Sequence, residues 1–303
     1  MALVAFWVAL ATTVGVVCEL RTAWAGRAAN RALGVMLYVL SPFVSYVGFA
    51  HLRLSIDAAA GLGVAYVGLG LAGTFTWLVG RRMRLTRAAL GGLIVPVIIV
   101  NTGYLGFPMV VALLGQSALI HAIAYDQVVS GPMVFTVGFG VGAAFGSGEA
   151  FDLRERLRRF LTRNPPLVGA LAGLLAPAGW APHVLVGVSH AVVELMLVSG
   201  FFAVGVRLSS ERREDGARLL ELPDRRVLLA LLARFTINPT LLILVSLAGV
   251  AVPAPYLLQA VMPSGIMSLV IGHAYGLDQR LIATVIVWGT LLAITVGTIV
   301  SLA

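Results

Sequence analysis

The chain has 303 residues, of which 59% are hydrophobic and 11% are charged, against roughly 25% charged residues in a soluble domain. This balance excludes a soluble globular protein and favours a protein that folds in lipid, where ten helices of about 20 residues would use about two thirds of the chain. The net charge of +8 comes from arginines in short stretches between apolar runs, which is typical of membrane topology and argues against a nucleic-acid partner.

The apolar runs predict ten transmembrane helices joined by short polar connections. The first run resembles the apolar part of a signal peptide, but no positive residues precede it and no A-x-A cleavage site follows it, so we expect it to be retained. The sixth helix is short, and the fifth is long enough to be tilted. The expected helices cover 2–18, 33–50, 58–79, 88–113, 117–145, 165–178, 183–206, 226–249, 254–274 and 279–301.

The arginines follow the odd-numbered predicted helices, whereas the even-numbered connections hold Arg53 alone. Cytoplasmic connections of membrane proteins carry an excess of positive residues. We therefore expect the odd connections in the cytoplasm and both termini on the extracytoplasmic side of an inner or plasma membrane. The arginines of the odd connections lie within 21–31, 81–87, 154–163 and 207–226, and at 280.

A charged, helix-like connector at 148–164 divides the chain into a first five-helix unit at 1–147 and a second at 165–303. Because each unit has an odd number of helices, the second enters the membrane in the opposite sense to the first. If the units are structural repeats, they must be inverted repeats, an architecture of secondary transporters. The expected fold is an all-α membrane protein with two inverted five-helix repeats.

The fourth and ninth predicted helices are both interrupted near their middle. Asn101-Thr-Gly-Tyr-Leu-Gly106 aligns with Pro263-Ser-Gly-Ile-Met-Ser268 at an offset of 162 residues. Glycine and proline weaken helices and also occur as plain kinks or packing notches. Paired interruptions in corresponding helices favour a midplane binding site, because an unwound segment frees backbone N–H and C=O groups for a ligand.

A half-helix N-terminus at such an interruption favours an anion. The amide of Asn101 can donate to a carboxylate, and Thr102 and Ser264 add hydroxyl groups. The candidate substrate-binding residues are Asn101, Thr102, Gly103, Tyr104, Pro108, Pro263, Ser264 and Gly265.

These segments resemble the auxin efflux carrier family. Asn101-Thr102 followed by Gly106-x-Pro108 is similar to its N-T-x-x-x-G-x-P motif, and Gln259-Ala260-x-x-Pro263-x-Gly265-Ile266 is similar to its penultimate helix. Further similarities are Arg163-Asn164-Pro165-Pro166, Tyr275, Thr284 and Gly289.

The family includes plant auxin carriers and bacterial malonate or malate carriers. The resemblance implies an elevator fold in which the two broken helices cross at the prolines. It also implies carboxylate binding near Asn101. Helices 1, 2, 6 and 7 would form a scaffold that can form a homodimer, and helices 3–5 and 8–10 would move with the substrate. The substrate itself does not transfer, because members differ in it.

Ionisable residues deep in predicted helices are expensive and usually functional. Asp126 and Arg234 both fall near mid-depth, where they would form a buried pair used in proton or ion coupling, or a structural salt bridge. His190 and Glu194 share one helix face and would relay protons, line the substrate path or form a plain polar pair. Two candidate ligands do not make a metal site, so we expect no metal.

The sequence predicts a secondary carrier for a small carboxylate, with no cofactor beyond a coupling H⁺ or Na⁺. A membrane-embedded sensor or channel for the same ligands would look similar. An intramembrane enzyme would need a nucleophile with a base, or paired acids, and no such motif is present. A single cysteine, Cys18, excludes an intrachain disulfide, and the absence of a P-loop argues against an ATP-driven pump.

Overall fold

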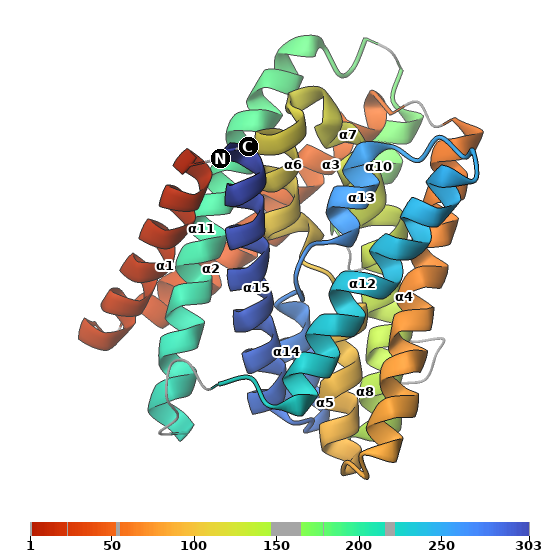
Figure 1. The fold of residues 1–303 in the computed structure, drawn as a ribbon. Coiled ribbons are helices and arrows are strands. Elements are labelled where there is room, and N and C mark those ends of the chain that lie inside the picture. Colours follow the sequence, from red (N-terminus) through yellow and green to blue (C-terminus); the bar gives the residue numbers. More distant parts are fainter. Residues whose placement is uncertain are drawn as a thin grey trace.

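The computed structural model describes residues 2–22, 24–52, 55–146, 165–177, 179–215 and 222–302. Every regular element in these ranges is helical, which confirms the all-α prediction (Figure 1). Both chain termini lie at the same end of the helices (Figure 1). The predicted connector 148–164, with its arginines, lies outside the described residues, as does Arg53.

The first half of the chain contains long helices and several short helical pieces. Its elements are α1 (Ala2–Arg21), α2 (Ala25–Val35), the π-helical η1 (Met36–Leu40), α3 (Ser41–Ala50), α4 (Ile56–Arg82), α5 (Arg87–Ile98), the π-helical η2 (Thr102–Gly106), α6 (Phe107–Leu114), the 3-10 helix η3 (Gln116–Ala118), α7 (Leu119–Tyr125), the π-helical η4 (Asp126–Ser130) and η5 (Met133–Gly138), and α8 (Phe139–Phe145).

The second half is built from longer and less interrupted helices. Its elements are α10 (Pro165–Leu175), α11 (His183–Asp215), α12 (Arg225–Leu247), α13 (Ala254–Ala260), α14 (Met267–Tyr275) and α15 (Gln279–Leu302). Pro239 lies inside α12 without ending it.

The ends of the observed helices lie within three residues of the predicted ends, with two exceptions. Helix α11 continues to Asp215, beyond its predicted end at 206. The prediction ended too early because the last turns of the helix are charged, and hydropathy detects only the apolar part. Helix α2 begins at Ala25, earlier than expected, because it is amphipathic: Ala25 and Ala29 are buried, while Arg27 and Arg31 are exposed. Amphipathic helices bury one stripe and carry polar residues on the other face.

Four helices in the described ranges are long and apolar enough to cross a membrane, at Ile56–Arg82, Val184–Ala203, Arg225–Leu247 and Gln279–Val300. A crossing helix needs about 20 apolar residues. Shorter apolar helices include Arg87–Ile98 and Thr102–Leu114, which follow one another across an interruption. The protein is therefore a multi-pass membrane protein.

The helices form two groups. One contains α1, α2, α3, α10 and α11, in which α1 packs along α11 and α10 packs along α3. Both packed pairs are close: a Cβ on Gly205 would lie 2.0 Å from the Thr12 carbonyl oxygen, and one on Gly173 would lie 2.2 Å from that of Tyr46. Small residues allow such backbone approach between helices in lipid. This group is called the α1–α11 group below.

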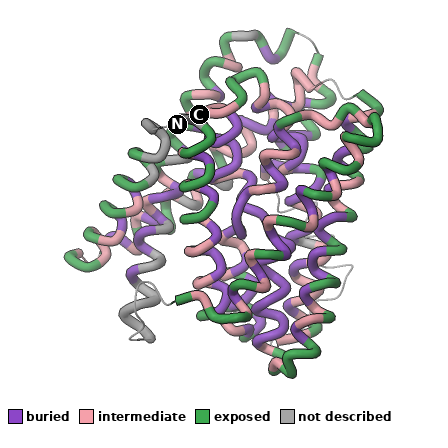
Figure 2. Tube along the Cα trace, viewed as in Figure 1, coloured by how far each residue is buried: buried purple, intermediate pink, exposed green. Residues whose placement is uncertain are grey.

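The second group contains α4 to α8 and α12 to α15, with α4 packed along α12 and α5 in contact with α4, α12, α15 and α8. Helix α5 is its centre, since every residue from Ala89 to Ile98 is buried. Figure 2 shows buried residues gathered in the middle of the molecule. This group, called the α5 group below, holds both interrupted helices.

Candidate functional site at the crossing of two interrupted helices

Two helices are broken at the positions where the sequence predicted interruptions. Between α5 and η2, and between α13 and α14, the chain is extended, and the two segments form an antiparallel bridge at Val100 and Ser264. The Asn101 backbone N–H donates to the Pro263 carbonyl oxygen at 2.8 Å. The Gly265 N–H donates to the Ile99 carbonyl oxygen at 2.9 Å. The two broken helices thus cross and satisfy part of each other's freed backbone.

The crossing requires glycine at position 265. A Cβ there would lie 2.9 Å from the Val100 carbonyl oxygen, which is backbone and cannot swing away. The aligned Gly103 is different, because a Cβ there would find no atom closer than 3.9 Å, the Oδ1 of Asp126. The aligned glycines therefore serve different purposes, close backbone packing at Gly265 and open space at Gly103.

Asn101 caps the half-helix that begins at the first break. Its side-chain Oδ1 accepts a hydrogen bond from the Leu105 N–H at 3.3 Å, and its carbonyl oxygen accepts from the Gly106 N–H at 3.0 Å. Its side chain is nearly buried, with 5% of the residue exposed. Among the described residues its Nδ2 has no hydrogen-bond partner, so a donor remains next to a helix N-terminus.

A carboxylate faces the same turn. The Thr102 hydroxyl donates to Asp126 Oδ1, and the Gln127 Nε2 donates to Asp126 Oδ2 at 2.7 Å. Asp126 is the first residue of π-helical η4, and π-helical turns are frequent at functional sites. The first break therefore brings together an amide donor, a helix N-terminus and a carboxylate.

Side chains at and before the second break donate to the backbone around the first break. The Ser264 hydroxyl donates to the Pro96 carbonyl oxygen at 2.6 Å, near the end of α5. Gln259 Nε2 donates to the Thr102 carbonyl oxygen at 3.2 Å and to the Ala122 carbonyl oxygen at 3.5 Å. Both Ser264 and Gln259 are fully buried.

Arg234 is a residue of α12 whose side chain contacts the end of α13, and it forms no ion pair with Asp126. Its Nε donates to the Met262 carbonyl oxygen at 3.0 Å, and its Nη2 donates to the Ala260 carbonyl oxygen at 2.8 Å. Asp126 instead takes its hydrogen bonds from Thr102 and Gln127. The predicted pairing of Asp126 with Arg234 is therefore wrong, because Arg234 donates to carbonyl groups at the second break, whereas Asp126 accepts from Thr102 at the first break and from its neighbour Gln127.

His190 and Glu194 lie apart from the crossing, on α11. Neither a hydrogen bond nor an ion pair joins their side chains in the described structure, and Glu194 is exposed. His190 lines a cavity of about 90 Å³ between α3, the start of α7 and α11. Helical spacing alone placed the two residues on one face, but it did not predict what that face contacts.

Two other predicted residues border the first break. Tyr104 packs against α11, since a Cβ on Gly200 would lie 3.5 Å from Tyr104 Cβ. Pro108 is buried in α6, which continues the half-helix begun by η2. Tyr104 thus connects the site to the α1–α11 group.

Sequence reasoning missed three polar residues around the crossing. Gln259 is the first residue of the motif that resembles the family's penultimate helix, but no role was predicted for it. Its amide joins α13 to the first break. Gln127 had no sequence signal beyond its place beside Asp126. Asn238 is buried within α12, and its Nδ2 donates to the Tyr125 hydroxyl at 3.0 Å.

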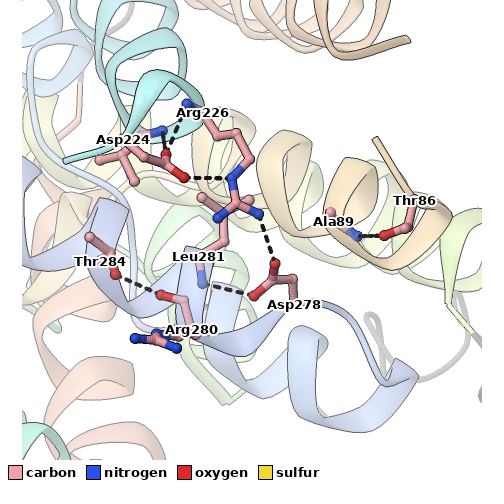
Figure 3. A network of polar contacts seen from close by, with 9 residues as sticks. Thr86, Ala89, Asp224, Arg226, Asp278, Arg280, Leu281 and Thr284 are labelled. Carbon is pink, nitrogen blue, oxygen red and sulfur yellow. Dashed lines mark hydrogen bonds and ion pairs between the residues drawn. The ribbon is translucent and has the colours of Figure 1, made fainter. Parts of the chain in front are cut away.

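A polar network closes one end of the α5 group, away from the crossing (Figure 3). Asp224 caps α12 by accepting from the Arg226 and Val227 N–H groups, and Arg226 bridges Asp224 at 2.7 Å and Asp278 at 3.3 Å. Burial alone would raise the pKa of Asp224, but the hydrogen bonds from Val227 and Arg226, with the Arg226 charge, lower it overall. These residues border a cavity of about 400 Å³.

Comparison with known proteins identifies relatives of this chain. The family model described as "Membrane transport protein" matches residues 188–301. The uncharacterized transporter MJ1031 of Methanocaldococcus jannaschii is 29% identical over 228 residues, which cover 70% of this chain and 68% of that protein. An uncharacterized transporter of Methanothermobacter thermautotrophicus is 27% identical over 230 residues, which cover 74% and 71% of the two chains.

The matched region includes the second interrupted helix, and the matched proteins are named as transporters. The crossing of α5–η2 with α13–α14 carries the motifs that first indicated the auxin efflux carriers. The chain is therefore similar to this family of membrane transport proteins over residues 188–301, and to two archaeal transporters over most of its length.

Proposed function

We propose that the chain is a secondary active transporter that moves a small carboxylate anion by an elevator-type mechanism. The observation that carries the proposal is the first break, where a helix N-terminus and the free amide donor of Asn101 meet at the crossing. A carboxylate is the ligand that such a pair of donors suits best. Thr102 and Asn101 are nearly buried, whereas Gly103 and Tyr104 are partly exposed, so the anion would enter from the side of Gly103.

Asp126 supplies a reason for proton coupling. Its carboxylate is hydrogen-bonded to Thr102, beside the turn where the anion would bind. Two like charges at this distance in a poorly solvated site repel each other strongly. Protonation of Asp126 would remove that repulsion, so the anion and a proton would bind together. Gln127 and Thr102 would hold the carboxyl group in place through both steps.

The packing supports two inverted repeats and about ten membrane crossings. Exchange of the two halves of the chain turns the α1–α11 contact into the α10–α3 contact, and both are close helix pairs. The same exchange maps α4 and α12 onto each other, and these two helices pack together. Both termini lie at one end of the helices (Figure 1), which an even number of crossings requires. With the positive-inside rule, that end would face the extracytoplasmic side.

The two helix groups would be the two parts of an elevator. The α5 group, with the crossing at its centre, would move against the α1–α11 group, and Tyr104 beside Gly200 would lie at the sliding surface. Alternating access in carriers of this architecture is a movement of one bundle against the other around a fixed site.

The test is uptake into proteoliposomes with a panel of labelled mono- and dicarboxylates, including an auxin. Each acid is run with and without proton and sodium gradients. Saturable uptake of one acid, accelerated by a proton gradient, supports the carrier. Saturable binding without uptake under every gradient would assign the protein to sensors instead, and neither binding nor uptake of any carboxylate would contradict the proposed substrate class.

A further inference from the structure

Arg234 is a fully buried cation whose partners are backbone carbonyl groups. Its exposed fraction is 0%, and it makes no ion pair with a carboxylate in the described ranges of the chain. Two of its nitrogens donate to the carbonyl oxygens of Ala260 and Met262, at the end of α13 and in the extended segment after it. A buried charge without a carboxylate partner is expensive, so these carbonyl groups must stabilise it.

The carbonyl groups at this place carry the negative end of a half-helix. In carriers with broken helices, such half-helix C-termini and unwound carbonyl groups coordinate the coupling cation. An arginine suits the same oxygens, because its guanidinium is always charged, offers several donors in a fixed fork, and is more weakly hydrated than an ammonium.

We propose that Arg234 is a tethered cation that takes the place of a bound alkali-metal ion at the second break. Its guanidinium holds the ends of the broken helix in position for the crossing, and no Na⁺ is needed there. Coupling to sodium at this break is therefore excluded, and the proton at Asp126 remains as the coupling ion, a part that rests on the proposed function.

Among the described residues, the first break has no buried arginine that corresponds to Arg234. The position that aligns with Arg234 at the 162-residue offset is Ala72, a buried residue of α4. There the freed Pro96 carbonyl oxygen takes a hydrogen bond from the neutral Ser264 hydroxyl. The cation therefore belongs to one break, and it reaches that break from α12.

The first experiment measures thermal stability of the purified chain in detergent, in buffers of sodium, potassium or N-methyl-D-glucamine chloride. Wild type should have the same Tm in all three. Arg234→Met removes the charge at similar length and should lower the Tm in N-methyl-D-glucamine by about 10 °C, through two lost charged hydrogen bonds. Sodium, or a low concentration of guanidinium, should restore several degrees of that loss. Arg225→Met is the matched control, because Arg225 is exposed on the same helix, and it should behave as wild type.

If Arg234→Met cannot be purified, Arg234→Lys keeps the charge and should fold with a lower Tm that sodium does not change. Stabilisation of the wild-type protein by sodium over N-methyl-D-glucamine would overturn the proposal. An unchanged Tm of Arg234→Met, or a lowered Tm that neither sodium nor guanidinium raises, would overturn it as well.

The second experiment separates this inference from the proposed function. Wild-type uptake of the transported acid should be the same with sodium or N-methyl-D-glucamine on both sides of the membrane, and uptake driven by a sodium gradient would overturn the inference. If no acid is transported, the carrier proposal fails, whereas the cation dependence of the Arg234→Met Tm still decides the role of Arg234.

Discussion

The two breaks at the crossing differ in chemistry although they align in sequence. At the break between α5 and η2, Asn101 retains a free amide donor, and Asp126 faces the open space at Gly103. At the break between α13 and α14, Ser264 donates to Pro96, and Arg234 caps the end of α13. The first break has the Asn101 amide left for a ligand. At the second break the Ser264 hydroxyl and two Arg234 nitrogens are used within the protein, while Arg234 Nη1 has no hydrogen-bond partner in the described ranges.

The difference shows how a repeated architecture can be divided between binding and support. Both breaks free backbone groups that lipid cannot satisfy. One set is satisfied by residues of the chain, which makes the crossing rigid. The other is left partly open, and a rigid support on one side holds the open side in a fixed geometry.

The largest effect is expected from substitution of the aligned glycines, which tests whether the two breaks differ in packing. In Gly265→Ala the new methyl would press on the Val100 carbonyl oxygen, and overpacking of about 1–3 kcal/mol should lower the Tm by roughly 5–10 °C. Gly63→Ala is the control, because no atom lies within 4 Å of the added Cβ on α4. A wild-type Tm for Gly265→Ala would mean that the crossing is looser than described.

Gly103→Ala tests the other aligned glycine, at the first break. The added methyl has room, with Asp126 Oδ1 as its nearest neighbour at 3.9 Å, so the Tm should stay within a few degrees of wild type. The methyl would occupy space beside the proposed anion site and should weaken carboxylate binding about tenfold, or roughly 1.4 kcal/mol. Equilibrium binding of the labelled acid measures it. Unchanged affinity would show that the anion does not bind beside this turn.

Asp126→Asn tests the carboxylate of the first break. In wild type, binding of the acid should weaken as the pH rises, by up to about tenfold per unit, because a proton is bound together with the anion. The asparagine is neutral at every pH, so its binding curve should be flat over a range in which the substrate stays ionised. A sloping curve in the variant would show that another group carries the proton.

The smallest effect is expected far from both breaks, in the network of Figure 3. Arg226→Ala removes the bridge from Asp224 to Asp278, whose side chains are 45% and 27% exposed. Partly exposed ion pairs contribute about 0–1 kcal/mol, so the Tm should fall by at most a few degrees and uptake should not change. A large loss of uptake would give this end of the α5 group a part in transport.

Much of the fold could be predicted from hydropathy and from the placement of glycine and proline. The interruption at Asn101 and the one at Pro263 were found because backbone breaks leave a local sequence signal. The amphipathic start of α2 and the charged end of α11 were missed, since neither is apolar throughout. Contacts were predicted less well: depth suggested that Asp126 pairs with Arg234, but the structure gives them different partners.

The contacts of Gln259 show why long-range partners could not be predicted from the sequence. Its amide reaches the Thr102 carbonyl oxygen, 157 residues away in the chain, and nothing in the local pattern indicates that contact. Long-range partners depend on how helices rotate and tilt against each other, which composition does not determine. The sequence could therefore indicate which segments meet, while the satisfied and open groups at the crossing required the structure.

The most direct measurement is equilibrium binding and uptake of the transported acid by Asn101→Ala and Ser264→Ala, prepared side by side. The account predicts that Asn101→Ala remains folded but loses most of its affinity and uptake. Ser264→Ala should have a Tm lower by a few degrees and near wild-type affinity, because its hydroxyl serves α5. Wild-type affinity in Asn101→Ala, or loss of binding in a folded Ser264→Ala, would contradict the assignment of the anion to the first break.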